Sequence, residues 1–309
     1  MRGIILDNLI EKMRSDESIF FITADMGINL VERIQSEFPK RFLNVGIAEQ
    51  NAIGVAAGLA NLGYRPWVYS ISNFLVHRCF EQLRNDAALH KYPITLLGTS
   101  TGFDNAPLGP THHIIDDWGL VAGMPGTTVF SPSTVEYAST IVDRVCEANG
   151  VNYVRVAKGS PSIAHSDSDV FFTGQESRAK FLVISYGGVG ARLAQNGDLL
   201  GQCALAIVNR LSPIPPALES ALAEEPDFVV VVEDQMARTG LASALALFIA
   251  TSGVRTRLLS VAPDCFDLVV GESAEEYDRR YALDPDSVLK RIQAITTEDA
   301  QMPHRSNRC

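Results

Sequence analysis

A single glutamate stands at the entrance of an almost wholly apolar segment. Residues 41–60 read RFLNVGIAEQNAIGVAAGLA, which predicts a short strand over 41–45, then a turn with Glu49, then a helix. A helix that is apolar on all sides is typically buried. Gly54 and Gly58 each cost roughly 1 kcal/mol in helix propensity, so we expect another backbone to pack closely on their shared face. Glu49 therefore either stabilises its own helix or takes part in chemistry.

Two polar loops follow other predicted strands. Asp25 comes after the strand pattern SIFFIT at 18–23, and a Gly/Pro-rich loop over 99–113 follows a strand at 93–98 and carries His112. Ligands bind at the carboxyl ends of strands in open α/β sheets, and loops of this length in compact domains are usually functional. His112 can donate a hydrogen bond or shuttle a proton, or it is a solvated loop residue. Asp25 can equally form a turn or cap a helix.

The amino-acid composition argues against several classes of function. The chain has 309 residues, 46% of them hydrophobic, which suits one large or two medium domains. A net charge of -10 without any Lys/Arg run argues against nucleic acid, and no segment approaches the ~20 apolar residues of a membrane span. The five cysteines form no C-x-x-C pair, so neither a zinc site nor a disulfide framework is indicated. The amphipathic N-terminal segment does not read as a signal peptide, so we expect a cytoplasmic enzyme subunit.

Strand and helix patterns alternate along the chain, with a helix expected over 72–90 and strands expected over 181–185 and 228–232, among others. We expect an α/β protein with two doubly wound, largely parallel-sheet domains. The predicted boundaries are a first domain over 1–160, a polar linker over 161–178, a second domain over 179–298 and a flexible tail over 299–309. The run GGVG at 187–190 lacks the spacing of a dinucleotide-binding loop, so a tight strand-to-helix turn is the preferred interpretation.

The segment around Glu49 resembles the pyrimidine-binding domain of transketolases, in which a nearly identical run ends in the catalytic glutamate. In that family the glutamate hydrogen-bonds a ring nitrogen of the aminopyrimidine of thiamine diphosphate. This contact favours the tautomer that removes the proton from the thiazolium carbon. The resemblance covers residues 1–295 of this chain but only the second half of the family. It implies that Glu49 binds the cofactor and is catalytic.

The resemblance extends to further cofactor residues. Asp25 matches the family's aspartate after the first strand, which lies near the thiazolium and diphosphate portion of the cofactor. Aligned on the R-x-x-E-Q run that begins at Arg78, Phe74 matches an aromatic residue that packs on the aminopyrimidine. Ile71 stands where a second aromatic residue usually does, so a stacking contribution is lost there. An aromatic residue at a helix start is otherwise usually part of the core, and the assignment of Phe74 rests on the alignment.

Two residues match substrate positions of the family. The run Gly109-Pro110-Thr111-His112 matches its G-P-T-H, in which the histidine faces the reacting centre and contacts an oxygen of the donor. Arg155 matches a basic position that can reach the anionic end of the substrate, and a guanidinium suits phosphate or carboxylate. An arginine near the end of a strand can equally make a structural ion pair.

Leu108 marks a departure from the family. Sugar-specific transketolases usually have an acidic residue and Asp-Gly just before P-T-H, and that aspartate binds a donor hydroxyl. Here Pro107 and Leu108 occupy the matching positions. Leucine accepts no hydrogen bond, and an unpaired buried polar group costs about 1–3 kcal/mol. A donor or acceptor with fewer hydroxyl groups is therefore indicated.

The family's diphosphate-binding signature, G-D-G followed by an asparagine, is missing from this sequence, and no cluster of oxygen ligands replaces it. We therefore expect the small subunit of a split transketolase-like enzyme, without a metal site of its own. Its partner chain would carry the G-D-G site, Mg²⁺ and the diphosphate. The pair would form an α2β2 complex, inactive as separate chains, that transfers a two-carbon ketol unit from a ketose to an aldehyde.

Two alternatives remain open at this point. One is a subunit of a decarboxylating thiamine diphosphate enzyme, similar to deoxyxylulose-phosphate synthase or to the β subunit of 2-oxo acid dehydrogenases, which Leu108 keeps possible. The other is a regulatory subunit whose site has decayed. Ile71 and Leu108 argue mildly for decay, whereas Glu49, Phe74 and His112 argue against it.

Overall fold

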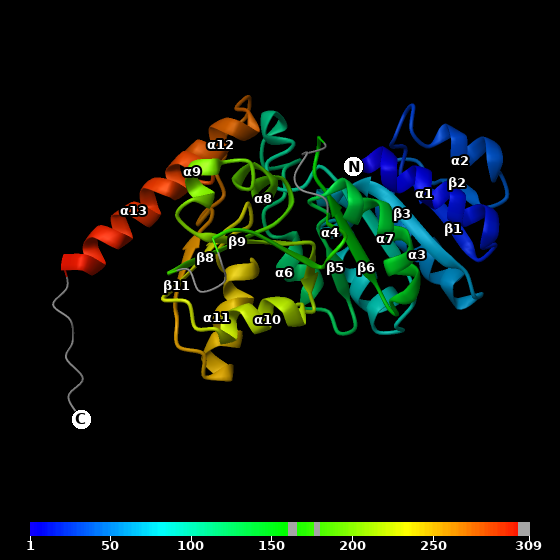
Figure 1. Ribbon diagram of the computed structural model, residues 1–309. Helices are drawn as coiled ribbons and strands as arrows, with labels where there is room; N and C mark the ends of the chain where they lie inside the picture. Colours follow the sequence, from blue (N-terminus) through cyan, green and yellow to red (C-terminus); the bar gives the residue numbers. More distant parts are fainter. Residues whose placement is uncertain (160–165, 176–179, 302–309) are drawn as a thin grey trace.

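The N-terminal part of the protein is built on a seven-stranded sheet. The computed structural model describes residues 1–159, 166–175 and 180–301 (Figure 1). The strand order is β10-β5-β6-β4-β3-β1-β2. The strands are β1 (Ile19–Thr23), β2 (Phe42–Asn44), β3 (Arg65–Ile71), β4 (Thr95–Thr99), β5 (Thr128–Phe130), β6 (Asn152–Val156) and β10 (Arg210–Ser212). Strands β1 to β6 run parallel, and β10 pairs antiparallel with β5.

Alternating side chains of these strands pack against helices on both faces. Trp67 and Tyr69 of β3 point into one apolar cluster, whereas Val68 between them points into another. The first face is covered by α1 (Arg2–Ser15), α2 (Glu32–Glu37) and α7 (Val135–Glu147). The second is covered by α3 (Glu49–Asn61), α4 (Ser72–Val76), the π-helical turn η1 (Leu83–Ala88) and α6 (Asp117–Ala122).

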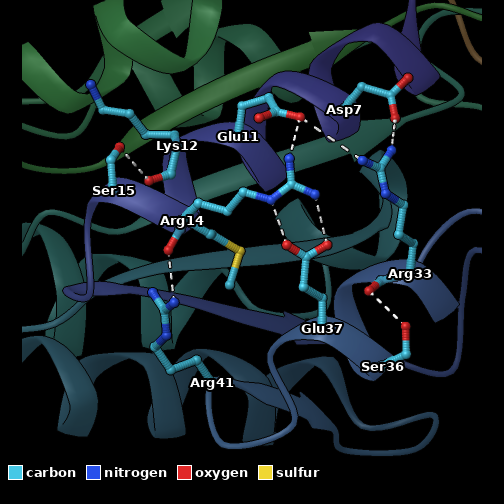
Figure 2. A network of polar contacts seen from close by, with 10 residues as sticks. Asp7, Glu11, Lys12, Arg14, Ser15, Arg33, Ser36, Glu37 and Arg41 are labelled. Atoms are coloured by element: carbon cyan, nitrogen blue, oxygen red, sulfur yellow. Dashed lines mark hydrogen bonds and ion pairs between the residues drawn. The ribbon is translucent and has the colours of Figure 1, made fainter.

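Surface ion pairs join α1 to α2. Arg14 donates to both carboxylate oxygens of Glu37, at 2.5 and 3.0 Å, and Arg33 donates to Asp7 at 3.0 Å (Figure 2). Arg41 reaches the carbonyl of Met13 near the end of α1, at 2.7 Å. Exposed pairs of this kind contribute roughly 0–1 kcal/mol each, so they orient α1 more than they stabilise it.

A five-stranded sheet organises the C-terminal part. Its order is β12-β11-β8-β9-β7, with β7 antiparallel to β9 and the other pairs parallel. The strands are β7 (Val170–Gly174), β8 (Phe181–Ser185), β9 (Ala204–Val208), β11 (Phe228–Val232) and β12 (Arg257–Val261). Helices α8 (Gly187–Leu193), α9 (Gly197–Leu200), α12 (Ala274–Arg280) and α13 (Pro285–Gln301) cover one face, and α10 (Pro216–Ala223) and α11 (Leu241–Ser252) the other. The predicted α/β class with two largely parallel sheets is confirmed.

The bounds of three predicted segments differ in the structure. The predicted linker at 161–178 contains β7, while its residues 161–165 and 176–178 lie outside the described part. The helix predicted over 72–90 is broken into α4, the short α5 (Phe80–Gln82) and η1. In the predicted tail, α13 continues to Gln301, and 302–309 are outside the described residues.

Helix α3 is not buried all round. A side chain added at Gly54 or Gly58 would meet no atom within 4 Å, so no backbone packs on that face within the described part of this chain. Ile47, just before the helix, and Leu62, just after it, are 78% and 74% exposed. The expected close approach to these glycines is therefore not made by any described residue.

Candidate functional site

The predicted site residues gather at the carboxyl edge of the first sheet. Asp25 follows β1, Glu49 follows β2, and Ile71 ends β3. The long loop with His112 follows β4, which lies next to β3. Strands β1 and β3 are neighbours in the sheet although β2 lies between them in sequence. The chain goes from β1 to β2 on one side and from β3 to β4 on the other, so the two connections diverge between β1 and β3. Such a switch point is where open α/β sheets form their ligand crevice.

Glu49 is the first residue of α3, but it does not cap the helix. Its side chain is 1% exposed, and the hydrogen-bond partners that the described residues give its carboxylate are side chains outside α3. Instead, one carboxylate oxygen accepts from the Ser70 hydroxyl at 3.1 Å, and the other accepts from the Arg78 guanidinium at 2.5 Å. The carboxylate is thus held at the edge of the sheet by residues of β3 and of the segment after α4. The helix-capping interpretation is not realised.

A guanidinium and two aromatic rings lie beside this carboxylate. The Arg78 guanidinium carbon stands 4.2 Å from the centre of the Phe74 ring, and the ring of His112 meets Phe74 edge-on at 5.4 Å. Ile71, which is partly buried, precedes α4 directly. The structure therefore brings Glu49, Phe74 and His112 to one place. Arg78 and Ser70 were not predicted as site residues, because their contact with Glu49 depends on how α3, β3 and the chain after α4 pack.

Asp25 lies at the rim and is bonded to β2. It has a φ of +54°, and its backbone amide donates to the side-chain oxygen of Asn44 at 3.0 Å. The Asn44 amide donates back to the Asp25 carboxylate at 3.1 Å. The same Asn44 oxygen accepts from the Gly46 amide at 2.9 Å. Asp25 remains exposed, and this reciprocal pair joins the turn after β1 to the turn after β2 that leads to Glu49.

The loop after β4 presents its two histidines differently. His112 is partly exposed, and its Nδ1 lies 2.9 Å from the Thr111 hydroxyl. His113 is 2% exposed, and burial lowers the pKa of its imidazole. Leu108, at the end of the 3₁₀ turn η2 (Ala106–Leu108), is 54% exposed. No acidic side chain replaces it within this turn.

Arg155 is held in a buried ion pair. It is 1% exposed, and its guanidinium donates twice to Asp117, at 2.7 and 3.2 Å. Tyr153 and Gln235 complete the shell of Asp117, each at 2.6 Å. Of the two roles that the sequence allowed for Arg155, substrate contact or structural ion pair, the structure shows the ion pair. With its guanidinium bonded to Asp117, Arg155 is not proposed as a substrate contact.

A polar cavity opens at the same edge of the sheet. The sequence did not predict it. It has a volume of about 290 Å³ and lies between the start of α1 and the ends of β4 and β6. Arg2 and Lys158 both line it, together with Thr99. Lys158 donates to the carbonyl of Asp104 at 3.0 Å and to the side chain of Asn105 at 2.6 Å. Two cationic side chains around a polar cavity suit an anionic group.

The part of the chain that the structure describes has neither a metal-binding cluster nor a membrane-spanning helix. Among residues 1–159, 166–175 and 180–301, no three His, Cys, Asp or Glu side chains are arranged to hold a metal ion. No helix in these same ranges has the length and apolar character needed to cross a bilayer.

The family described as "Transketolase, pyrimidine binding domain" matches residues 1–161. A putative transketolase C-terminal section of Methanocaldococcus jannaschii is 30% identical over 297 residues, covering 93% of this chain and 93% of that protein. A subunit of the apulose-4-phosphate transketolase of Phocaeicola vulgatus is 28% identical, covering 94% of this chain and 95% of that protein. A 1-deoxy-D-xylulose-5-phosphate synthase of Thioalkalivibrio sulfidiphilus is 31% identical over 97% of this chain, which spans only 47% of that protein.

A solved structure shares the fold over nearly the whole chain. It is described as a split gene transketolase, inactive beta4 tetramer, and superposes with a TM-score of 0.80 at 24% identity, covering 95% of this chain and 96% of that one. The protein belongs to the transketolase family. Within that family it corresponds to the C-terminal section, with a pyrimidine-binding domain followed by a second α/β unit.

Proposed function

We propose that this chain is the C-terminal subunit of a split transketolase-like enzyme that transfers a two-carbon ketol unit from a ketose to an aldehyde. The observation that carries the proposal is Glu49. Its carboxylate is almost fully buried at the switch point of the sheet, yet its hydrogen-bond partners are Ser70 and Arg78 rather than amides of its own helix. The relatives that are themselves a C-terminal section and a separate transketolase subunit, and that match along nearly their whole length, support the same assignment.

The side chains at the site suit the aminopyrimidine of thiamine diphosphate. A buried carboxylate, paired with an arginine that lies over an aromatic ring, fits a flat heteroaromatic ring with a nitrogen that shares a proton. Glu49 would hold that proton at the ring nitrogen, and Phe74 and Ile71 would pack on the ring. When bound, the cofactor supplies a carbon nucleophile and an electron sink. Arg78 and Ser70 keep the carboxylate oriented by the contacts described above.

His112 is proposed to act on the substrate. Its ring lies edge-on to Phe74 at 5.4 Å, so it borders the surface on which the aminopyrimidine would lie. A neutral imidazole there can donate a hydrogen bond to the donor oxygen as negative charge develops. Asp25 would face the remainder of the cofactor from the rim.

We further propose that Mg²⁺ and the diphosphate are held by a partner chain, and that the two chains form an α2β2 complex in the cytoplasm. The open face of α3 supports a partner. Gly54 and Gly58 have empty space in front of them, and Ile47 and Leu62 are largely exposed on either side. Exposed apolar side chains beside small residues allow another protein to approach the backbone closely.

The substrate is proposed to carry an anionic end and few hydroxyl groups near the reacting carbon. Arg2 and Lys158 line the polar cavity at the sheet edge, which favours a phosphate, sulfonate or carboxylate. Leu108 offers no hydrogen bond to a hydroxyl on the donor. The relative from Phocaeicola vulgatus is described as acting on apulose-4-phosphate, which carries such an anionic end.

A titration of cofactor tests the split site. Thiamine diphosphate with Mg²⁺ is titrated calorimetrically into this chain alone, and then into its mixture with a chain that carries the G-D-G site. Binding only in the mixture is the expected result. Tight binding by this chain alone would contradict the proposal, because it would require a diphosphate site here.

A decarboxylating enzyme is the second candidate function. Leu108 and the 31% identity to a 1-deoxy-D-xylulose-5-phosphate synthase favour it. A donor screen of the reconstituted complex separates the two candidates. Release of carbon dioxide from pyruvate would support the second, and ketol transfer without gas release would support the first.

A further inference from the structure

We propose that His113 is a positioning residue which, together with Tyr277 of α12, places His112 in the site. The C-terminal unit would then take part in catalysis indirectly, by holding the loop after β4. The inference rests on the proposed function, because that function gives His112 its role. It is carried by the contacts that this loop makes with the two halves of the molecule.

The two adjacent histidines contact different parts of the protein. The His112 ring meets Phe74 of α4, whereas the His113 ring meets Phe103 at 5.4 Å and Tyr277 at 5.7 Å. Tyr277 belongs to α12, far along the chain in the C-terminal unit. A shift of His113 therefore moves its covalent neighbour His112 relative to Phe74.

His113 is held by packing of its ring. His113, Phe103 and Tyr277 are 2%, 3% and 0% exposed. Phe103 stacks on Tyr277 at 4.5 Å and on Tyr281 at 5.7 Å. Neither ring nitrogen of His113 has a hydrogen-bond partner among the described residues, although both nitrogens are buried. The imidazole thus serves as a flat group in an aromatic cluster that joins the loop to α12.

Backbone bonds attach the same loop to the C-terminal unit at two more points. The Gly271 amide donates to the Pro107 carbonyl at 2.9 Å, and the Met236 amide donates to the Ile115 carbonyl at 2.6 Å. Gly109 has no room for a side chain, because an added carbon would lie 2.7 Å from the side chain of Val270. The loop therefore follows the surface of the C-terminal unit on both sides of His112.

Residues of the N-terminal unit hold the other side of the loop. The Asn73 side chain donates to the His113 carbonyl at 2.8 Å, and His77 contacts Asp116 at 2.8 Å. The His113 main chain is thus bonded to α4 while its ring packs against α12. This residue spans the two units at the position next to the proposed catalytic histidine.

Hydrogen–deuterium exchange of this chain alone gives the first test. Tyr277→Leu removes the ring that His113 contacts, Tyr277→Phe keeps the ring, and Phe181→Leu removes another buried aromatic ring, at the start of β8. We expect Tyr277→Leu to raise exchange at residues 101–115 by about tenfold or more, because local opening becomes easier. The other two variants should leave exchange in these residues unchanged. His113→Ala and His113→Phe form a second pair with the same expectation, should Tyr277→Leu fail to fold.

Kinetics of the reconstituted complex give the second test. With Tyr277→Leu and His113→Ala we expect kcat/KM for the donor to fall by about tenfold, because small misplacements of a catalytic group are costly. The affinity for thiamine diphosphate should stay unchanged, since Glu49 and Phe74 are not touched. Equal exchange and equal kinetics in Tyr277→Leu and Phe181→Leu would overturn the inference. A complex inactive even as wild type would count against the proposed function, whereas the exchange experiment would still decide this inference.

Discussion

Two buried glutamates lie beyond the carboxyl ends of strands, one in each sheet of the molecule. Glu49 follows β2, Glu233 follows β11, each lies near the start of a helix, and each is 1% exposed. Glu233 accepts from the amides of Leu241 and Ala242, at 2.8 and 3.0 Å, and from the Tyr186 hydroxyl at 2.8 Å. Glu233 therefore caps α11, whereas Glu49 does not cap α3.

The difference shows how one residue type serves structure in one unit and is available for chemistry in the other. The carboxylate of Glu233 is enclosed by its own chain, and Gly240 packs directly against it. Burial raises the pKa of Glu233 to about 7. Glu49 is instead held by a hydroxyl and a half-exposed arginine at an edge with open apolar surface. The number of helix amides that a buried glutamate satisfies separates the two roles.

The largest expected effect is on catalysis. Glu49→Gln removes the proton-sharing carboxylate at constant shape, so we expect kcat of the reconstituted complex to fall by about 10²-fold or more. The melting temperature of the chain should change little, because no helix amide loses a partner. Steady-state kinetics and thermal unfolding measure the two quantities. A Glu49→Gln complex as active as wild type would support the decayed-subunit alternative.

The corresponding experiment on Glu233 concerns stability. Glu233→Ala leaves two buried amides and the Tyr186 hydroxyl unpaired, which should lower the free energy of unfolding by about 2–3 kcal/mol. The kcat of the remaining folded complex should be unchanged. Urea unfolding measures the loss, with the exposed Glu224→Ala as the control. If Glu233→Ala lowered kcat without lowering stability, the contrast between the two glutamates would fail.

The pH dependence of stability sharpens the contrast. Because burial raises the pKa of Glu233 from its usual 4.5 to about 7, the folded state binds more protons than the unfolded state between these values. The stabilisation of the folded state that follows from this raised pKa is thus fully present below pH 4.5 and is lost as pH rises through 7. In wild type relative to Glu233→Gln, the free energy of unfolding should fall with pH by up to about 1.4 kcal/mol per unit. Parallel curves for the two proteins would refute this.

The smallest expected effect is at Arg78. Its guanidinium pairs with Glu49 and lies over Phe74, but the side chain is 40% exposed. We expect Arg78→Leu to weaken binding of thiamine diphosphate to the complex by about threefold, because the guanidinium is partly exposed and the Ser70 hydroxyl still donates to Glu49. Arg84→Leu, which removes a guanidinium that donates to the neighbouring Asn85, is the matched control. Equal calorimetric affinities for both variants would remove Arg78 from the site.

The sequence indicated the strands well and the contacts between them poorly. The strands at 181–185 and 228–232 were predicted at their observed bounds, because strands buried on both faces are continuous apolar runs. Strand β7 was missed, since an edge strand with one exposed face resembles a polar linker. Strand β10 has three residues, and it is a strand only because it pairs with β5, far away in sequence.

The candidate site divides in the same way. Glu49 and His112 stand in local motifs, so the resemblance indicated both. The contacts of Ser70 and Arg78 with Glu49, and of Tyr277 with His113, join residues that no local pattern relates. Arg155 could be assigned to the substrate or to an ion pair from sequence alone, and only the packing of Asp117 against it distinguishes the two.

Strand β10 also limits how the chain can be divided. Residues of the second unit complete the first sheet, because Arg210 and Ser212 pair with Phe130 and Val129. A cut at the predicted boundary near residue 160 would strip that strand and leave the edge of β5 free to pair with other chains. The two units are therefore not interchangeable modules. Grafting a foreign second unit onto this pyrimidine-binding unit would have to bring along its own closing strand.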